Sequence, residues 1–252
     1  MTYKTIIVTS QAPVLTMTFN RAAARNAITQ TMVTECRAAL DDPAHADLSI
    51  VVWRGHADSF CVGADFAAHI DTADNHDAVD AQMLYELWQS ITTDSRIHIA
   101  LVHGQVSGGG VGFVSACDIS MASTDATFSL PELLFGLFPA CVLPFLTRRI
   151  GWQAAHVMTL TTKPIDAKAA QEKGLIDDYS TDPNTLLRKL LVRLRHLDRQ
   201  AIGRYKAFAS QAQATIETLK PMAITANKAL FSDARVRQAL QDFHTLGKLP
   251  FQ

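Results

Sequence analysis

Short β-branched runs alternate with amphipathic segments in the first half of the chain. Strands are predicted over residues 3–9 and 14–19, joined as a hairpin around Pro13, and buried-type strands over residues 49–53 and 99–106. Between them, two groups of apolar residues recur at helical spacing: Met32, Val33, Cys36, Ala39 and Leu40, then Leu84, Leu87, Trp88 and Ile91. Strands that alternate with helices predict an α/β fold.

After Pro139 the pattern becomes almost wholly helical. Helices are predicted near residues 151–161, 166–173, 183–197, 199–231 and 233–246. The third of them carries a leucine stripe, typical of a core or subunit interface rather than a cofactor site: Leu186, Leu187, Leu190, Leu191 and Leu194. Because neither a linker nor a repeat divides the sequence, we expect one domain.

Composition and charge narrow the function classes. The chain has 252 residues, of which 48% are hydrophobic and 19% charged, so it has ample material for a core. Its formal net charge is -1 and its basic residues are scattered, which argues against nucleic-acid binding. With neither a secretory leader pattern nor an apolar run of about 18 residues, we expect a cytoplasmic protein that does not span a membrane.

Cysteine and histidine usage predicts neither disulfides nor a metal site. The four cysteines are far apart and form no C-x-x-C pair, and the nine histidines are dispersed. We therefore expect reduced thiols and no bound metal.

Two glycine-centred turns carry the chemical signal. Residues 59–66 (SFCVGADF) follow a predicted strand, and at residues 107–110 (SGGG) a strand leads into an apolar helix. Glycine lets the backbone approach a ligand closely, and the first N–H groups of a helix have no partner within that helix. Such turns can hold an anion, although each one alone is equally typical of a tight turn that binds nothing.

A nucleotide is the weaker explanation of these turns. The sequence has no G-K-[ST] of a phosphate-binding loop, and Phe113 and Ser115 stand where a dinucleotide fingerprint needs a third glycine.

Together, the two turns resemble the oxyanion-hole loops of the crotonase (enoyl-CoA hydratase/isomerase) superfamily. In that family one N–H follows the glycine of an F-C-x-G-A-D segment and the other belongs to the middle glycine of G-G-G, which implies Ala64 and Gly109 as donors here. Three further segments resemble family motifs: residues 19–28 (FNRAAARNAI), 128–139 (FSLPELLFGLFP) and 173–177 (KGLID). The resemblance therefore extends over nearly the whole chain.

This resemblance implies a crotonase fold, with a repeated ββα spiral core and a C-terminal helical trimerisation region. The spiral core with the active site would occupy residues 1–195, and the helical region residues 196–252, of a single domain unit. A homotrimer or a dimer of trimers is expected. No separate cofactor is expected, because the substrate is carried on coenzyme A or on the phosphopantetheine of an acyl carrier protein.

Hydratases of the family typically use two glutamates. The position of the first is Gly112 in this chain, whereas the second, in the P-E segment, is retained as Glu132. The chain thus departs from ordinary two-glutamate hydration and keeps one acid/base. After Pro139 it also has bulkier residues than the G-A-G-G of many hydratases, which predicts bulkier walls around the acyl group.

Residues 60–66, 110–116 and 133–146 are very similar to one branch of the family, the polyketide β-branching dehydratases. That resemblance implies dehydration of 3-hydroxy-3-methylglutaryl on an acyl carrier protein to the 3-methylglutaconyl thioester. Ala64 and Gly109 would stabilise the thioester enolate, and Glu132 would protonate the departing C3 hydroxyl. Whether Glu132 also removes the C2 proton is left open by the sequence.

Several other residues are candidates with two interpretations each. Asp65 is the next catalytic candidate or a helix N-cap, and Tyr85 either contacts substrate or packs in the core with a hydrogen-bonded hydroxyl. Arg25 and Arg21 either bind the pantetheine phosphate or are solvated. His103 is interpreted as a strand histidine without a catalytic role.

Three alternative functions stay open at this point. Within the family these are a glutaconyl-thioester decarboxylase and an enoyl-CoA hydratase or isomerase, which need the same oxyanion hole. Outside catalysis, a trimer could merely bind acyl carriers. The retention of Glu132 beside both glycine turns argues against that last alternative.

Overall fold

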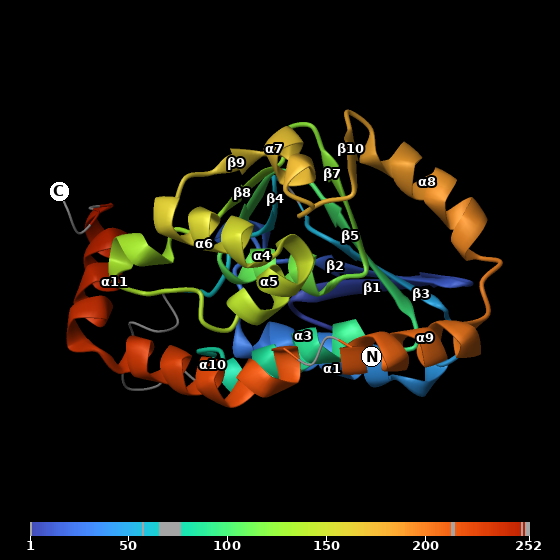
Figure 1. Ribbon diagram of the computed structural model, residues 1–252, viewed down its shortest axis with the longest axis horizontal. Coiled ribbons are helices and arrows are strands. Elements are labelled where there is room, and N and C mark those ends of the chain that lie inside the picture. Colours follow the sequence, from blue (N-terminus) through green and yellow to red (C-terminus); the bar gives the residue numbers. More distant parts are fainter. Residues whose placement is uncertain (1, 57, 66–76, 213–214, 248, 250–252) are drawn as a thin grey trace.

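The computed structural model describes residues 2–56, 58–65, 77–212, 215–247 and 249 (Figure 1). Its main sheet is mostly parallel and has the order β1-β2-β3-β5-β7-β10, in which only β1 and β2 pair antiparallel. The strands of this sheet are β1 (Ile6–Gln11), β2 (Val14–Phe19), β3 (Ile50–Arg54), β5 (Ile97–Val102), β7 (Ile119–Ser123) and β10 (Asp178–Ser180). The predicted hairpin is confirmed, with Ile6 opposite Phe19.

A smaller second sheet has the order β4-β6-β8-β9. Its strands are β4 (Ser59–Cys61), β6 (Gln105–Ser107), β8 (Thr127–Ser129) and β9 (Ile165–Asp166). The pairs β3 and β4, β5 and β6, and β7 and β8 each place one strand in each sheet before a helical segment follows. The chain therefore repeats ββα units, as the predicted spiral core requires.

The helices follow the sheets in chain order. They are α1 (Gln30–Asp41), α3 (Ala81–Thr93), α4 (Gly109–Ala116), α5 (Leu143–Ile150), α6 (Trp152–Thr161), α7 (Ala167–Glu172), α8 (Pro183–Leu194), α9 (Arg199–Ala212), α10 (Thr215–Ser232) and α11 (Ala234–Leu246). Short 3-10 turns are η1 (Ala22–Ala24), η2 (Pro43–His45) and η3 (Glu132–Phe135). In Figure 1, α10 runs along the lower edge of the molecule beside α3, and α11 turns up its left edge.

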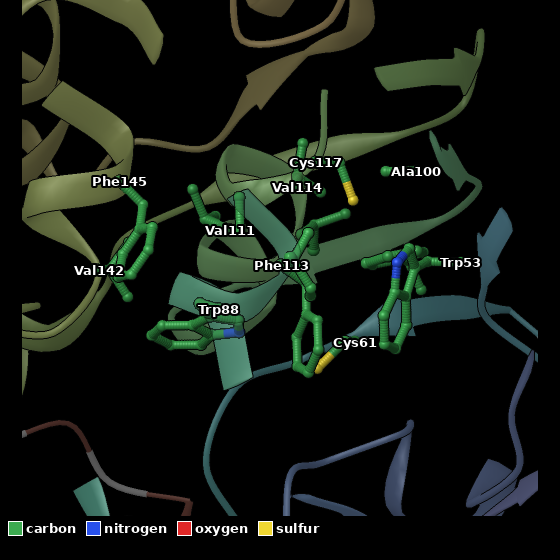
Figure 2. Close-up of a cluster of buried hydrophobic side chains, with 14 of the residues drawn as sticks. Trp53, Cys61, Trp88, Ala100, Val111, Phe113, Val114, Cys117, Val142 and Phe145 are labelled. Carbon is green, nitrogen blue, oxygen red and sulfur yellow. The ribbon is translucent and has the colours of Figure 1, made fainter. Parts of the chain in front are cut away.

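Alternate residues of the central strands face two different cores, because side chains along a strand point to opposite faces. One face packs against α8 and contains Ile50, Val52, Ile99 and Leu101, together with Leu187 and Leu194. This confirms that the leucine stripe of α8 is core. The other face holds the larger cluster of Figure 2, where Trp53 lies next to Phe113 and Trp88 next to Phe145.

Two boundaries predicted from the sequence differ in the structure. Residues 99–106 are not one strand: β5 ends at Val102 and β6 begins at Gln105, in the other sheet. Gly104 makes this change of sheet, since its φ is +58° and a Cβ there would lie 1.9 Å from the Asp58 carbonyl oxygen. His103 accordingly lies between strands and not within one.

The C-terminal helices were largely predicted, with one difference in extent. The stretch 199–231 forms α9 and α10, and residues 213–214 lie outside the described part of the chain. Two kinds of element were not predicted from the sequence: helix α5, and the short strands β4, β7, β8, β9 and β10.

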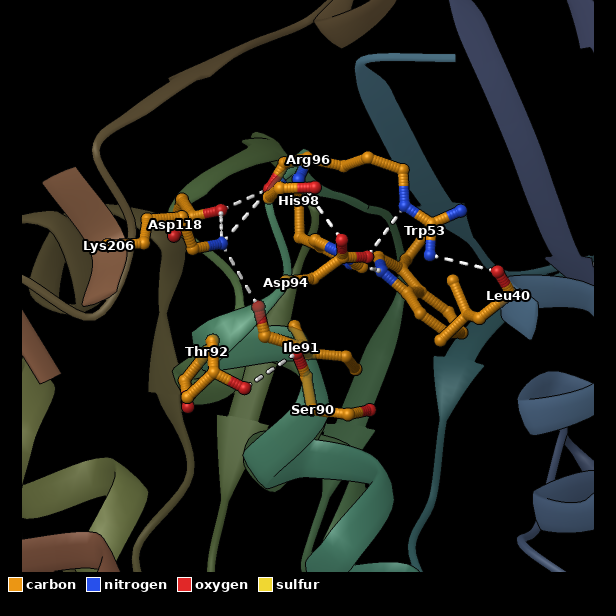
Figure 3. Close-up of polar contacts among 12 residues, drawn as sticks. Leu40, Trp53, Ser90, Ile91, Thr92, Asp94, Arg96, His98, Asp118 and Lys206 are labelled. Carbon is orange, nitrogen blue, oxygen red and sulfur yellow. Dashed lines mark hydrogen bonds and ion pairs between the residues drawn. The ribbon is translucent and has the colours of Figure 1, made fainter. Parts of the chain in front are cut away.

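A buried polar network fixes the end of α3 against the sheet (Figure 3). Asp94 accepts a hydrogen bond from Arg96 Nε at 2.6 Å, and His98 Nε2 lies 2.9 Å from the same carboxylate. The Trp53 indole N–H donates to His98 Nδ1 at 3.0 Å, so Nε2 carries the imidazole proton. Lys206 of α9 donates to the backbone oxygens of Ile91 and Arg96 and to Asp118.

No helix in the described part of the chain is both long and apolar enough to cross a membrane. Among the described residues, His, Cys, Asp and Glu side chains form no group of three that could hold a metal ion.

Candidate active site

The first glycine turn places the Ala64 N–H in a fixed direction. Ile28 donates its N–H to the Gly63 carbonyl oxygen at 2.7 Å, and Asp65 donates its N–H to the Ile28 carbonyl oxygen at 3.0 Å. Consecutive N–H groups along an extended backbone point to opposite sides. The N–H of Ala64 therefore points away from Ile28, on the side where Ala64 lines a pocket.

The second glycine turn ends in the first residue of α4. Gly108 has φ +51° and donates its N–H to the Ser129 carbonyl oxygen at 3.1 Å, so that Gly109 begins the helix. A residue in this position has no intrahelical acceptor for its N–H, and the helix dipole adds positive potential there. Arg148 and Arg149 bind carbonyl oxygens at the opposite end of α4, those of Ser115 and Cys117. The positive end of α4 thus opens toward the pocket.

The two turns touch each other through their backbones. A Cβ on Gly63, whose φ is +90°, would lie 3.0 Å from the Ser107 oxygen and 3.1 Å from the Gly109 nitrogen. A Cβ on Gly110 would lie only 2.1 Å from the Cys61 oxygen. This close approach requires glycine. It brings Ala64 and Gly109, the two predicted donors, into the lining of one pocket.

Glu132 supplies an ionisable group to the same pocket. It begins η3 directly after Pro131, and its Oε1 would lie 3.1 Å from a Cβ on Gly108. Its Oε2 is buried and has no hydrogen-bond partner among the described residues. Loss of hydration raises the pKa of this carboxyl from 4.5 to about 7. A carboxyl with that pKa can exchange a proton in either direction near neutral pH.

The turn that carries Glu132 rests on the C-terminal helix. Phe135 and Leu137 form a small core with Val236 and Leu240 of α11. The rings of Phe135 and Phe243 also pack edge to face, with centroids 5.0 Å apart. The position of Glu132 therefore depends on a helix about 100 residues later in the chain.

Trp88 of α3 occupies the space next to Gly112. A Cβ on Gly112 would lie 2.6 Å from two carbons of the indole, so no side chain fits at this position while Trp88 is in place. Trp88 is 1% exposed and lines the pocket, and in Figure 2 its nitrogen edge faces the Phe113 ring. The indole thus fills the space that a side chain at position 112, the first of the two glutamate positions of a typical hydratase, would enter.

The remaining lining of the pocket is mostly apolar. Besides the residues above, it comprises Val62, Val79, Ala81, Leu84, Leu137, Phe138, Pro139, Cys141, Val142, Asn227 and Phe231. Burial raises the pKa of the Cys141 thiol to about 12, so this thiol stays neutral. Among the described lining residues, Glu132 is the single carboxylate.

Three other predicted site residues are not in this lining. Asp65 is paired with Arg21, whose Nη2 lies 2.9 Å from Oδ2 of the carboxylate. Its other predicted role is the N-cap of a helix that would follow it. That role involves residues 66–76, which lie outside the described part of the chain. Tyr85 is fully buried and donates its hydroxyl to the Ile216 carbonyl oxygen at 2.5 Å, which is the core interpretation.

Arg25 lies on the surface side of the first turn. It has φ +48° and donates from Nη1 to Gln105 Oε1 at 3.1 Å. A role for Arg25 or Arg21 in binding a pantetheine phosphate stays a prediction.

Neither Trp88 nor Asn227 was predicted from the sequence to line the pocket. Trp88 belongs to an ordinary apolar stripe, and its place in the pocket becomes visible only through its contact with Gly112. Asn227 and Phe231 come from α10, far from every motif, so no local pattern connects them with Glu132.

Known proteins resemble this chain over its whole length. The model of the enoyl-CoA hydratase/isomerase family matches residues 9–251. The bacillaene synthase dehydratase PksH of Bacillus subtilis (strain 168) is 43% identical over 254 residues, which cover 100% of this chain and 98% of PksH. The 2,3-dehydroadipyl-CoA hydratase of Escherichia coli (strain K12) is 34% identical over 188 residues, covering 72% of this chain and 71% of that protein.

Solved structures give the same relationship. The crystal structure of PksH from Bacillus subtilis superposes with a TM-score of 0.94 at 43% identity and covers 99% of this chain and 100% of that chain. An enoyl-CoA hydratase from Mycobacterium avium superposes with a TM-score of 0.82 at 27% identity, covering 98% of this chain and 99% of that chain.

Proposed function

The chain belongs to the enoyl-CoA hydratase/isomerase family, and we propose that it dehydrates 3-hydroxy-3-methylglutaryl-acyl carrier protein to 3-methylglutaconyl-acyl carrier protein. Membership of this family confirms the predicted crotonase resemblance and fold, and identifies the chain as an enzyme of the hydratase and dehydratase type. The full-length similarity to PksH, a dehydratase of polyketide synthesis, supports the more specific reaction.

One observation carries the proposal: a carboxylate lies beside two backbone donors, and its Oε2 is buried without a partner among the described residues. Negative charge develops on the thioester carbonyl oxygen as the C2 proton leaves, and the N–H groups of Ala64 and Gly109 would stabilise it. Such preorganised donors contribute about 10²- to 10³-fold each in comparable sites. Glu132 is then the group that moves the proton.

Glu132 would serve both proton transfers in a syn elimination. In its ionised form it takes the C2 proton, and the electron pair of the C–H bond moves into the enolate. The same proton then passes to the C3 hydroxyl, the C–O bond breaks, and water leaves while the enolate forms the double bond. Glu132 ends ionised, as it began. A pKa near 7 suits both halves of this cycle, because the carboxylate is a stronger base than usual and its acid is still a competent donor.

The substrate carrier and assembly state are part of the same proposal. PksH is named for a synthase that builds polyketides, which supports an acyl carrier protein rather than free coenzyme A as the carrier. We also expect a cytoplasmic homotrimer or dimer of trimers, in which the predicted C-terminal region from residue 196 contributes to the interface. Large apolar side chains exposed on α9 and α10, Tyr205, Phe208 and Met222, support that assignment.

The test is a mass-spectrometric assay with hydroxymethylglutaryl-loaded carrier protein. We expect loss of one water from the acyl group, and Glu132→Gln should slow it by about 10²-fold or more while acyl-carrier binding is nearly unchanged. Glu172→Gln, which alters an exposed glutamate of α7, is the matched control and should behave like the wild type. Near-native turnover by a folded Glu132→Gln protein would refute the single-carboxylate mechanism.

A further inference from the structure

We propose that Asn227 of α10 recognises the distal carboxylate of the acyl group, and so sets the preference for a dicarboxylic acyl chain. This inference rests on the proposed function and extends it to the part of the substrate that does not react.

Asn227 lies on the face of α10 that packs against the rest of the molecule. Ile216 and Ala223 are the buried residues of α10, and Asn227 lies one turn beyond Ala223 on the same face. The Ala223 carbonyl oxygen lies 3.8 Å from Cys141 Sγ, which fixes this face of α10 against the pocket wall. Phe231, a further turn on, lines the same pocket. Asn227 thus brings a polar side chain to the pocket from this face of α10.

The amide of Asn227 is not used by the described part of the protein. Its side chain is partly buried and forms no hydrogen bond with any described residue. An amide offers two N–H donors and one carbonyl acceptor, and those of Asn227 stay free for a ligand because its side chain is only partly buried. A ligand oxygen in the pocket would satisfy the donors.

The charges in the pocket favour a neutral donor for this task. No lysine or arginine is among the described residues that line it. A cation there would bind a distal carboxylate more strongly, but it would also stabilise ionised Glu132 and lower the pKa that both proton transfers use. A neutral amide binds the distal carboxylate and does not lower the pKa of Glu132.

The experiment compares two tethered substrates, 3-hydroxy-3-methylglutaryl and 3-hydroxy-3-methylbutyryl, which differ only by the distal carboxylate. The readout is the ratio of kcat/KM for the two. A hydrogen bond to a charged group predicts that Asn227→Ala lowers kcat/KM for the glutaryl substrate about 10- to 100-fold and changes that for the butyryl substrate less than about threefold. Asn227→Asp, which places like charges together, should lower the first value further.

Thr225→Asp is the matched control, because it adds the same charge to an exposed position of α10 and should leave the ratio unchanged. Equal losses on both substrates in folded Asn227 variants, or an unchanged ratio, would overturn the inference and leave the proposed dehydration intact. Failure of the wild type to dehydrate the glutaryl substrate would overturn both.

Discussion

Two carboxylates, Asp94 at the end of α3 and Glu132 at the start of η3, are withdrawn from water into opposite surroundings. Asp94 lies against Arg96 and His98, and despite its burial these partners lower the pKa of its carboxyl well below the usual range (Figure 3). Glu132 has an apolar pocket and a carboxylate oxygen without a partner among the described residues, and its pKa rises to about 7. The first arrangement stabilises the fold, whereas the second keeps a proton carrier available at a cost in stability.

Replacing Asp94, the carboxylate that has partners, should have the largest effect on the free energy of unfolding. Asp94→Asn keeps the shape but leaves the Arg96 guanidinium, only 7% exposed, without its counter-charge. We expect a loss of about 4 kcal/mol in the free energy of unfolding. Because the pKa of Asp94 is lowered in the folded protein, its contribution is complete above the unfolded pKa, so the loss should be constant from pH 6 to 9.

Chemical denaturation at several pH values measures this loss. Activity per folded molecule should stay near that of the wild type, since Asp94 is not in the pocket lining. A loss below about 1 kcal/mol would mean that the pair is no stronger than a surface ion pair.

Removing the Glu132 carboxylate should have the opposite effect and raise the free energy of unfolding. The folded pKa of Glu132 is about 7 and the unfolded value 4.5, so between these pH values the native state holds a proton that the unfolded state has released. Wild-type stability therefore falls as pH rises through this window. The difference corresponds to about 3 kcal/mol above pH 8.

We expect Glu132→Gln to be the more stable protein by about that amount at pH 8 to 9, and to match the wild type near pH 4.5. Unfolding curves of both proteins across this range measure it. Parallel pH dependence of the two would show that Glu132 is better hydrated than its surroundings indicate.

The pH dependence of catalysis sharpens the comparison further. A carboxylate that removes the C2 proton first must start ionised, so kcat/KM should rise about 10²-fold from pH 5 to 7 and level off above. Steady-state rates on the loaded carrier protein give this profile. A decline above pH 7 instead would make Glu132 the acid alone and require a separate base.

The smallest effect is expected at Gly112, where Trp88 fills the space of a side chain. Gly112→Ala puts a methyl group against the indole and should lower the free energy of unfolding by about 2 kcal/mol, even though alanine favours a helix. Trp88→Phe with Gly112→Ala should cost less than the sum of the two single changes, because the smaller ring makes room. Additive costs in a double-mutant cycle would mean that the two residues do not press on each other.

The sequence allowed the alternation of strands and helices, the two glycine turns and Glu132 to be predicted, since each is encoded within a few neighbouring residues. It did not allow Gly104 to be recognised as the point where the chain changes sheets, because no local pattern shows which sheet the strand from Gln105 joins. Tyr85 and Asp65 were uncertain for a related reason. Their partners, the Ile216 carbonyl and Arg21, are remote in the chain, so no local pattern reveals these contacts.

The contact between Trp88 and Gly112 also restricts the order in which such a site can change during evolution. A glutamate at position 112 cannot be accommodated until the indole has gone, and loss of the indole alone leaves a cavity beside Phe113 and Phe145. Whichever of the two residues, Gly112 or Trp88, is substituted first, the change lowers stability before any new chemistry is gained. A lineage with this pair is thus separated from a two-carboxylate site by a less fit intermediate, and laboratory evolution toward one should start from a stabilised variant.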